Sequence, residues 1–134
     1  MARYDVTNGN PCTGKILNND SMYVSMGGTA DNTTVNASGM LIVSNGGTAD
    51  TTTVNGHWGY LIVSNGGTAT NTTVNANGEF DVFSGGVAAN TTVKSGGRLE
   101  SFLFVLNDNE IILSSGLRML LRCPVWCFGI GCRP

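Results

Sequence analysis

Apolar and polar residues alternate in short segments that recur along most of the chain. Residues 40–43 read Met-Leu-Ile-Val and residues 60–63 read Tyr-Leu-Ile-Val, and both are followed by Ser-Asn-Gly-Gly-Thr-Ala. Four Gly-Gly pairs recur at spacings of 19, 20 and 19 residues, beginning at Gly27, Gly46, Gly66 and Gly85. A period of about 20 residues with β-branched runs and glycine turns is typical of a solenoid. The sequence therefore predicts an all-β solenoid of about four rungs over residues 21–97.

Alternation within the first strand of each repeat sorts its side chains into columns. Two columns are apolar in all four copies: Met22, Leu41, Leu61 and Phe80, and then Val24, Val43, Val63 and Val82. The column between them, Tyr23, Ile42, Ile62 and Asp81, is mixed, as expected for a position that faces solvent. The strand should point its Leu and Val positions inward, and the Gly-Gly pair after it should form a corner with positive φ. The outward Tyr23, Ile42 and Ile62 are candidates for an apolar stripe that supports self-association.

A second strand is predicted directly after an alanine that recurs beyond each corner. Its valines should point inward: Val35, Val54, Val74 and Val93. Its threonines should then point outward: Thr34, Thr53, Thr73 and Thr92. These are flanked by Asn32, Thr51, Asn71 and Asn90 on one side and by Asn36, Asn55, Asn75 and Lys94 on the other. The pattern predicts two strands per rung and a flat polar face whose amides hydrogen-bond to one another between rungs.

The two ends of the chain differ from the repeats. Residues 1–20 are predicted to be an N-terminal cap or a leader to the first rung, and residues 98–134 a partial fifth rung followed by a non-repeat tail. That tail is either a native cap or the product of a truncation or frameshift. It contains three cysteines spaced C-x3-C-x4-C, at Cys123, Cys127 and Cys132. This spacing suits ordinary thiols or a disulfide better than a metal site, so no metal is predicted.

Composition and charge exclude several functions. Charged residues make up 12% of the chain and its net charge is -2, which argues against a basic surface for nucleic acid. His57 is the only histidine, and no carboxylate pair or Ser/His/Asp set keeps a fixed relation to it. We therefore predict that the protein is not an enzyme and needs no cofactor. The first residues lack the basic start and apolar stretch of an export signal, so the chain is either cytoplasmic or a piece of something longer.

One corner carries an insertion of a single residue. The sequence Gly56-His57-Trp58-Gly59-Tyr60 lengthens this corner and pushes its aromatic rings outward. Two interpretations are open. Trp58 and Tyr60 could stack on sugars, or they could cover a local bulge.

The repeat Leu-x-Val-Ser-x-Gly-Gly-x-Ala-x-x-Thr-Thr-Val-Asn resembles the passenger repeats of AIDA-type self-associating autotransporter adhesins, over residues 21–97. The resemblance implies a right-handed β-helix on the outer surface of a Gram-negative cell, where it mediates adhesion, autoaggregation and biofilm formation. It implies three kinds of partner: like chains, a host-cell surface, and a dedicated glycosyltransferase that adds heptose to serine and threonine hydroxyls. Complete family members are far longer and begin with an export signal, so this chain is expected to be a fragment of a passenger.

Glycan acceptors can be carried over from the resemblance to single residues. They are Thr34, Thr53, Thr73 and Thr92, with Ser25, Ser44, Ser64 and Ser84 as further candidates. The alternative is that these residues simply suit strands and turns. Two other functions stay open: a purely structural scaffold, and a threonine array that orders water or ice. One outward threonine per rung with asparagine beside it suits the array poorly.

Overall fold

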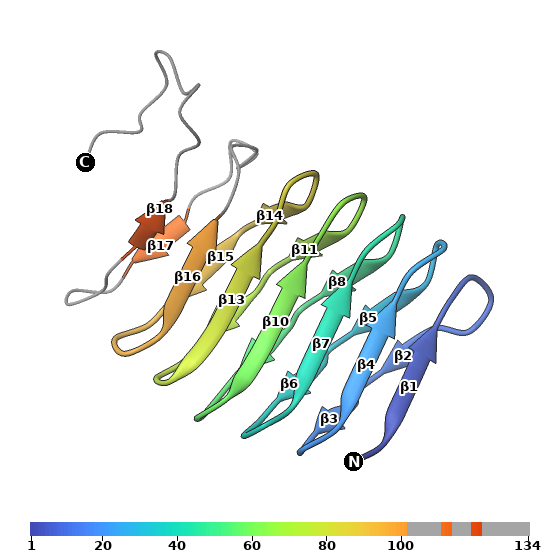
Figure 1. The fold of residues 1–134 in the computed structure, drawn as a ribbon, viewed down its shortest axis with the longest axis horizontal. Coiled ribbons are helices and arrows are strands. Elements are labelled where there is room, and N and C mark those ends of the chain that lie inside the picture. The colour runs from blue at the N-terminus through green and yellow to red at the C-terminus, as the bar shows by residue number, and fades with distance from the viewer. Residues whose placement is uncertain (102–110, 114–118, 122–134) are drawn as a thin grey trace.

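The regular structure of this protein consists of β-strands. The structure, a computed structural model, describes residues 1–101, 111–113 and 119–121. Within these residues the chain coils through three parallel sheets and returns to each sheet once per turn (Figure 1). None of the described residues belongs to a helix that could span a membrane.

Each sheet collects one strand from successive turns. Sheet A contains, in spatial order, β1 (Arg3–Val6), β4 (Ser21–Val24), β7 (Met40–Val43), β10 (Gly59–Val63), β13 (Gly78–Val82), β16 (Arg98–Ser101) and β18 (Met119–Leu121). Sheet B contains β2 (Cys12–Thr13), β5 (Thr29–Asp31), β8 (Thr48–Asp50), β11 (Thr68–Thr70) and β14 (Val87–Ala89). Sheet C contains β3 (Ile16–Leu17), β6 (Thr34–Val35), β9 (Thr53–Val54), β12 (Thr73–Val74), β15 (Thr91–Val93) and β17 (Ile111–Leu113). The predicted β-solenoid is confirmed.

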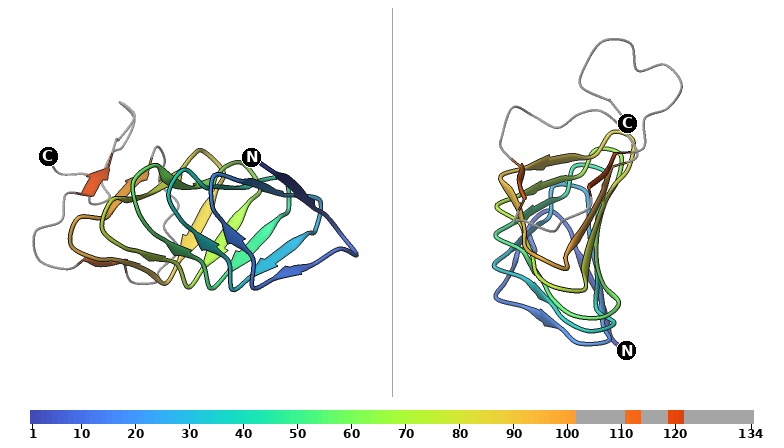
Figure 2. Two further views of the ribbon diagram at one scale, coloured as in Figure 1. Left: turned by 90° about the horizontal axis from the view of Figure 1, so that it is seen from below. Right: turned by 90° about the vertical axis from the view of Figure 1, so that its left-hand side faces the viewer.

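Equivalent residues of successive repeats lie beside each other. In sheet A, for example, Leu61 pairs with Leu41 on one side and with Phe80 on the other. The sheets enclose a narrow interior that runs along the axis of the solenoid (Figure 2). Because every turn uses the same register, each position of the repeat becomes a column of side chains.

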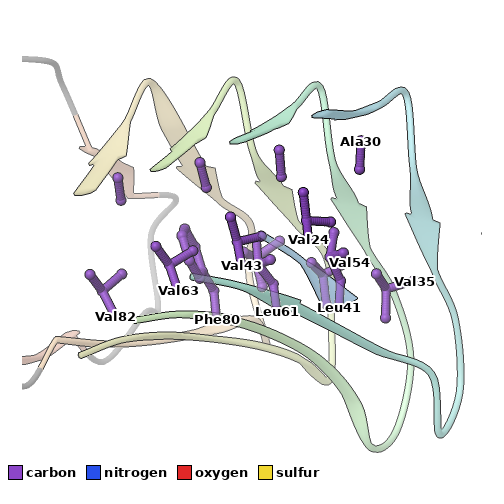
Figure 3. Close-up of a cluster of buried hydrophobic side chains, with 14 of the residues drawn as sticks. Val24, Ala30, Val35, Leu41, Val43, Val54, Leu61, Val63, Phe80 and Val82 are labelled. Atoms are coloured by element: carbon purple, nitrogen blue, oxygen red, sulfur yellow. The ribbon is translucent and has the colours of Figure 1, made fainter. Parts of the chain in front are cut away.

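The inward columns form the core. Leu41, Leu61 and Phe80 have no exposed surface, and neither do Val43 and Val63 in the neighbouring column. They pack inside the coil with the alanines of sheet B and the valines of sheet C (Figure 3). Both predicted apolar columns of the first strand are therefore confirmed, as are the inward valines of sheet C.

The prediction of two strands per rung is wrong, because each turn has three. A residue with positive φ separates sheet B from sheet C in each of the four repeats: Asn32 (52°), Thr51 (54°), Asn71 (54°) and Asn90 (51°). This left-handed backbone conformation rotates the chain and ends the strand, and asparagine adopts it at low cost. The column that begins with Asn32 therefore lies at a corner, and the predicted polar face is not flat.

Residues 1–20 form a turn of the same kind as the repeats. β1, β2 and β3 pair in parallel with β4, β5 and β6, and Val6 and Leu17 extend the core. The described residues thus make five complete turns, from β1–β3 to β13–β15. β16 and β18 then continue sheet A, and β17 continues sheet C. Cys123, Cys127 and Cys132 lie outside the described residues.

The two glycines of each Gly-Gly pair serve different purposes. The first has positive φ, as predicted for the corner: 76° at Gly27, 82° at Gly46 and 79° at Gly66. The second is buried against the preceding turn. A Cβ at Gly28 would lie 2.2 Å from the carbonyl oxygen of Val6, and one at Gly47 would lie 2.3 Å from that of Val24. The second glycine is therefore required for close approach of two backbones.

A column of buried threonines was not anticipated from the sequence. Each lies next to an outward threonine, and all are 1% exposed: Thr33, Thr52, Thr72 and Thr91. None of their hydroxyls has a hydrogen-bond partner among the described residues. A buried hydroxyl without a partner is destabilising, because it has lost its bonds to water.

Replacing one of these buried hydroxyls with a methyl group should stabilise the protein. We expect Thr52→Val to raise the free energy of unfolding by about 1 kcal/mol, because valine has the same shape and no unpaired polar atom. Urea denaturation followed by circular dichroism would measure it. Thr53→Val is the matched control, and its half-exposed hydroxyl should leave stability within about 0.5 kcal/mol. A destabilised Thr52→Val variant would contradict the unpartnered state of this hydroxyl.

Candidate functional site

The outer face of sheet C carries the predicted threonine column, and an asparagine ladder runs beside it. Each ladder amide donates to the one in the preceding turn: Asn36 Nδ2 to Asn18 Oδ1 at 2.9 Å, Asn55 to Asn36 at 3.1 Å and Asn75 to Asn55 at 2.5 Å. Thr34, Thr53, Thr73 and Thr92 are all half-exposed. The predicted stacking of amides is confirmed for this column. The parallel register of sheet C places the four threonines in a regular row.

The outer face of sheet B adds a second row of hydroxyls. Thr29, Thr48 and Thr68 are half-exposed. Sequence reasoning assigned this segment to a corner and missed the row, although the residue between Gly-Gly and Ala is threonine in three of the four repeats. The column beside it is Asp31, Asp50, Thr70 and Ala89, so paired threonines do not repeat from turn to turn. No observation favours the alternative of a water-ordering or ice-ordering array.

Asp50 organises the polar groups of this face. Its Oδ1 accepts hydrogen bonds from Asn71 Nδ2 at 2.9 Å, Thr70 Oγ1 at 3.0 Å and Thr51 Oγ1 at 3.4 Å. The bonds from Asn71 and Thr70 stabilise the carboxylate and hold the pKa of Asp50 below its usual value. Asp50 thus links two successive turns at the corner between sheets B and C.

The predicted serines occupy two different positions of one corner. Ser25, Ser44 and Ser64 follow sheet A directly and are half-exposed. In the next turn it is Phe83 that occupies this position, because its backbone N–H donates to Val63 O as that of Ser64 donates to Val43 O. Ser84 therefore lies one position further along, level with Asn65. The register, and not the nearest serine in the sequence, decides which residues share a column.

The outer face of sheet A carries the predicted surface-contact residues. Tyr23, Ile42, Tyr60 and Ile62 are half-buried on this face. Met40 pairs with Tyr60 and joins the apolar stripe. At the N-terminal end the guanidinium of Arg3 lies 4.2 Å from the centre of the Tyr23 ring. The other predicted contact residue, Trp58, is at a corner and 63% exposed.

A charged cluster ends this stripe at β13 and β16. The carboxylates of Glu79, Asp81 and Glu100 lie within 4.8 Å of one another. Arg98 forms ion pairs with Glu79, at 3.3 Å, and with Glu100. Asp81 Oδ1 is buried and has no hydrogen-bond partner in the described part of the chain. Acidic clusters without an ion are common, and Arg98 already balances part of this charge, so no metal is assigned here.

Asp81 should make stability depend on pH. Burial and, to a lesser extent, the negative charge of Glu79 raise the pKa of its carboxyl from 3.8 to about 6, although Arg98 opposes the rise. The folded chain therefore binds this proton more tightly than the unfolded chain. The resulting stability is complete below pH 3.8 and is lost as the pH rises through about 6.

We accordingly expect Asp81→Asn to be more stable than the wild type at pH 7, with a gain that shrinks toward pH 4. The difference in urea midpoint between variant and wild type at the two pH values measures this. Glu79, Glu100, Arg98 and Tyr60 surround the carboxyl and are unchanged in both proteins. An equal difference at pH 4 and pH 7 would show that Asp81 does not titrate in this range.

The corner with the insertion brings three aromatic rings together. The ring centroids of Trp58 and Tyr60 are 6.5 Å apart with an interplanar angle of 47°, and those of His57 and Trp58 are 5.7 Å apart at 79°. The structure thus groups the two residues that the sequence proposed for contact with sugars.

Comparison with known proteins identifies the family. The sequence matches the model of the AIDA family, described as adhesin of bacterial autotransporter system, probable stalk, over residues 2–57 and 58–99. The chain belongs to the AIDA family of autotransporter adhesin stalks. These matched residues cover the five turns described above, including residues 3–17, which the repeat pattern did not include.

The AIDA stalk is also similar to a solved structure, described as the crystal structure of a TibC-catalysed hyper-glycosylated TibA fragment. The TM-score is 0.43 with 24% sequence identity, and the match covers 90% of this chain and 64% of the TibA fragment. This chain therefore spans less than two thirds of that fragment. No functionally curated protein matches the sequence.

Proposed function

We propose that this AIDA stalk is part of an adhesin passenger on the bacterial surface, where it mediates adhesion and autoaggregation and accepts O-linked heptose on outward hydroxyls. The observation that carries the proposal is the row of half-exposed threonines on sheet C, held beside the asparagine ladder. The family membership supports the adhesin role. The resemblance of the repeats to AIDA-type passengers supports a glycosyltransferase as partner.

The geometry suits a transferase that modifies one hydroxyl after another. Neighbouring strands of a sheet lie about 4.8 Å apart, so the hydroxyls of Thr34, Thr53 and Thr73 recur at a constant step in a constant environment. An enzyme that recognises one turn would meet the same surface again on the next. The threonines of sheet B and the half-exposed serines at the corner offer further acceptors of the same kind.

The acceptor role can be tested by mass spectrometry. The chain would be co-expressed with an autotransporter heptosyltransferase, and its intact mass and peptides would be mapped over residues 21–97. We expect heptose on Thr53 and its column but not on Thr52, since Thr52 is 1% exposed in the folded chain. Thr53→Val should then lose one sugar while Thr52→Val keeps all of them. An unmodified mass would refute the acceptor role, and heptose on Thr52 would refute selection by the folded surface.

Autoaggregation is assigned to the apolar stripe on sheet A. Bacteria that display the passenger should aggregate and settle out of suspension. Replacing Ile42 and Ile62 with glutamate should slow the settling, because the added negative charges on the stripes of two like chains repel each other. Thr53→Glu and Thr73→Glu, on sheet C, provide a control with the same added charge. If both double variants settle as fast as the wild type, neither face mediates autoaggregation.

A further inference from the structure

We propose that the corner at residues 56–60 is a binding site for a neutral sugar ring, with Trp58 as its stacking platform. The site needs no glycan on this chain, so it is independent of the acceptor role. Three observations support it: the backbone conformation of Trp58, the rigidity of the corner, and the polar groups around the ring.

Trp58 has a backbone conformation that bulky residues rarely adopt. The same corner recurs in each turn at the point where the chain enters sheet A, along the lower edge in Figure 1. The residue with positive φ at this corner is small or polar in the other turns: Asn19 (57°), Ser38 (60°), Asn77 (63°) and Gly96 (83°). Trp58 has φ 65° and is 63% exposed. A tryptophan at positive φ is strained, and strained backbone positions cluster at functional sites.

The neighbouring turns hold this corner in place. Its backbone accepts a hydrogen bond from Ser38 N–H to His57 O at 3.2 Å, and Gly56 N–H donates to Ala76 O at 3.3 Å. Within the corner, Gly59 N–H donates to Gly56 O at 3.2 Å. The backbone that carries the indole is therefore hydrogen-bonded to the turn before it and to the turn after it. Little conformational freedom is left to lose when a ligand binds.

The groups around the indole can contact both the apolar and the polar parts of a sugar ring. A sugar ring has an apolar C–H surface, which an aromatic face can cover, and hydroxyls at its rim. Ser38 and Asn77, exposed at the same corner of the adjacent turns, offer a hydroxyl and an amide that can both donate and accept. Tyr60 lies beside the indole and pairs with Glu79, whose carboxylate accepts hydrogen bonds. An apolar protein partner would instead leave these polar groups without bonds.

The charge near the site selects among sugars. Glu79 lies next to Tyr60, and Asp81 follows on the same strand. Arg98 is engaged with Glu79 and Glu100. A sialylated sugar would bring a further negative charge toward this cluster, so neutral sugars should bind more tightly.

The test uses the whole unglycosylated chain on an array of neutral oligosaccharides, each paired with its sialylated derivative. Neutral sugars that bind are then titrated by isothermal titration calorimetry, which measures the wild type and the variants without using Trp58 as the reporter. Trp58→Asn introduces the residue type that the next turn has at this position, Asn77, and asparagine adopts positive φ at low cost. It should weaken sugar binding at least tenfold, while the urea midpoint stays equal or rises.

Phe83→Ser is the matched control. It removes an exposed aromatic from another corner and restores the serine that earlier turns have there, so sugar binding should be unchanged. The proposal is overturned if no neutral oligosaccharide binds above the Trp58→Asn background, or if Phe83→Ser lowers binding as much as Trp58→Asn does. Equal binding of the sialylated partners would overturn the preference for neutral sugars.

Discussion

Gly47→Ala is expected to destabilise the solenoid by about 3 kcal/mol. The added Cβ would lie 2.3 Å from Val24 O and 2.6 Å from Val24 C, which are backbone atoms of the preceding turn. The two turns cannot move apart, because Thr48 N–H donates to Gly28 O and Ser44 N–H donates to Val24 O on the two sides of this corner. The clash must therefore break hydrogen bonds between turns. Urea denaturation followed by far-ultraviolet circular dichroism would measure the loss.

The neighbouring glycine is the control for this prediction. Gly46 has φ 82°, and the nearest atom to an added Cβ is Gly27 N at 3.7 Å. Gly46→Ala should lower the free energy of unfolding by only about 1 to 2 kcal/mol, which is the cost of holding an alanine in the left-handed backbone conformation. A loss at Gly46 that equals or exceeds the loss at Gly47 would mean that φ, and not the approach of two turns, explains why the second glycine recurs.

Leu61→Ala is expected to cost about 2 to 5 kcal/mol of stability. Leu61 has no exposed surface and pairs with Leu41 and Phe80, so its removal opens a cavity in the middle of the core column. Each turn contributes only one strand to each sheet, so few other side chains can fill the space. The expected result is a large fall in the urea midpoint without loss of the parallel β-sheet spectrum in the absence of urea.

Ile62→Ala, one residue further along the same strand, is the matched control. Ile62 is half-buried on the outer face, so truncation should cost about 1 kcal/mol at most, mainly through lost strand propensity. If the two variants lost equal stability, the assignment of inward and outward columns in sheet A would be wrong. The comparison therefore tests the register of the fold as well as the size of one contact.

Some features of the site could not be read from single repeats. The cluster of Glu79, Asp81 and Glu100 forms only because β16 pairs with β13 in the register that brings Glu100 beside Asp81. Ser84 is predicted as an acceptor together with Ser64, but Ser64 lies two residues before its Gly-Gly pair and Ser84 only one, and the hydrogen bond of Phe83 N–H to Val63 O places Phe83 at the position of Ser64. Side chains from different turns meet through backbone pairing, which no local pattern specifies.

The sequence by itself determined the solenoid, its period and the inward columns of sheet A. It could do so because alternation has period two in any strand, and four copies showed which positions stay apolar, as at Leu61 and Val63. Only the tertiary structure decided that each turn has three strands and that Thr52 faces the interior. The reason is the corner at Thr51 and its equivalents, since asparagine or threonine at that position does not reveal whether φ is positive. Beyond that corner the alternation restarts on a new sheet, so a pattern read across it assigned the wrong shape to the polar face.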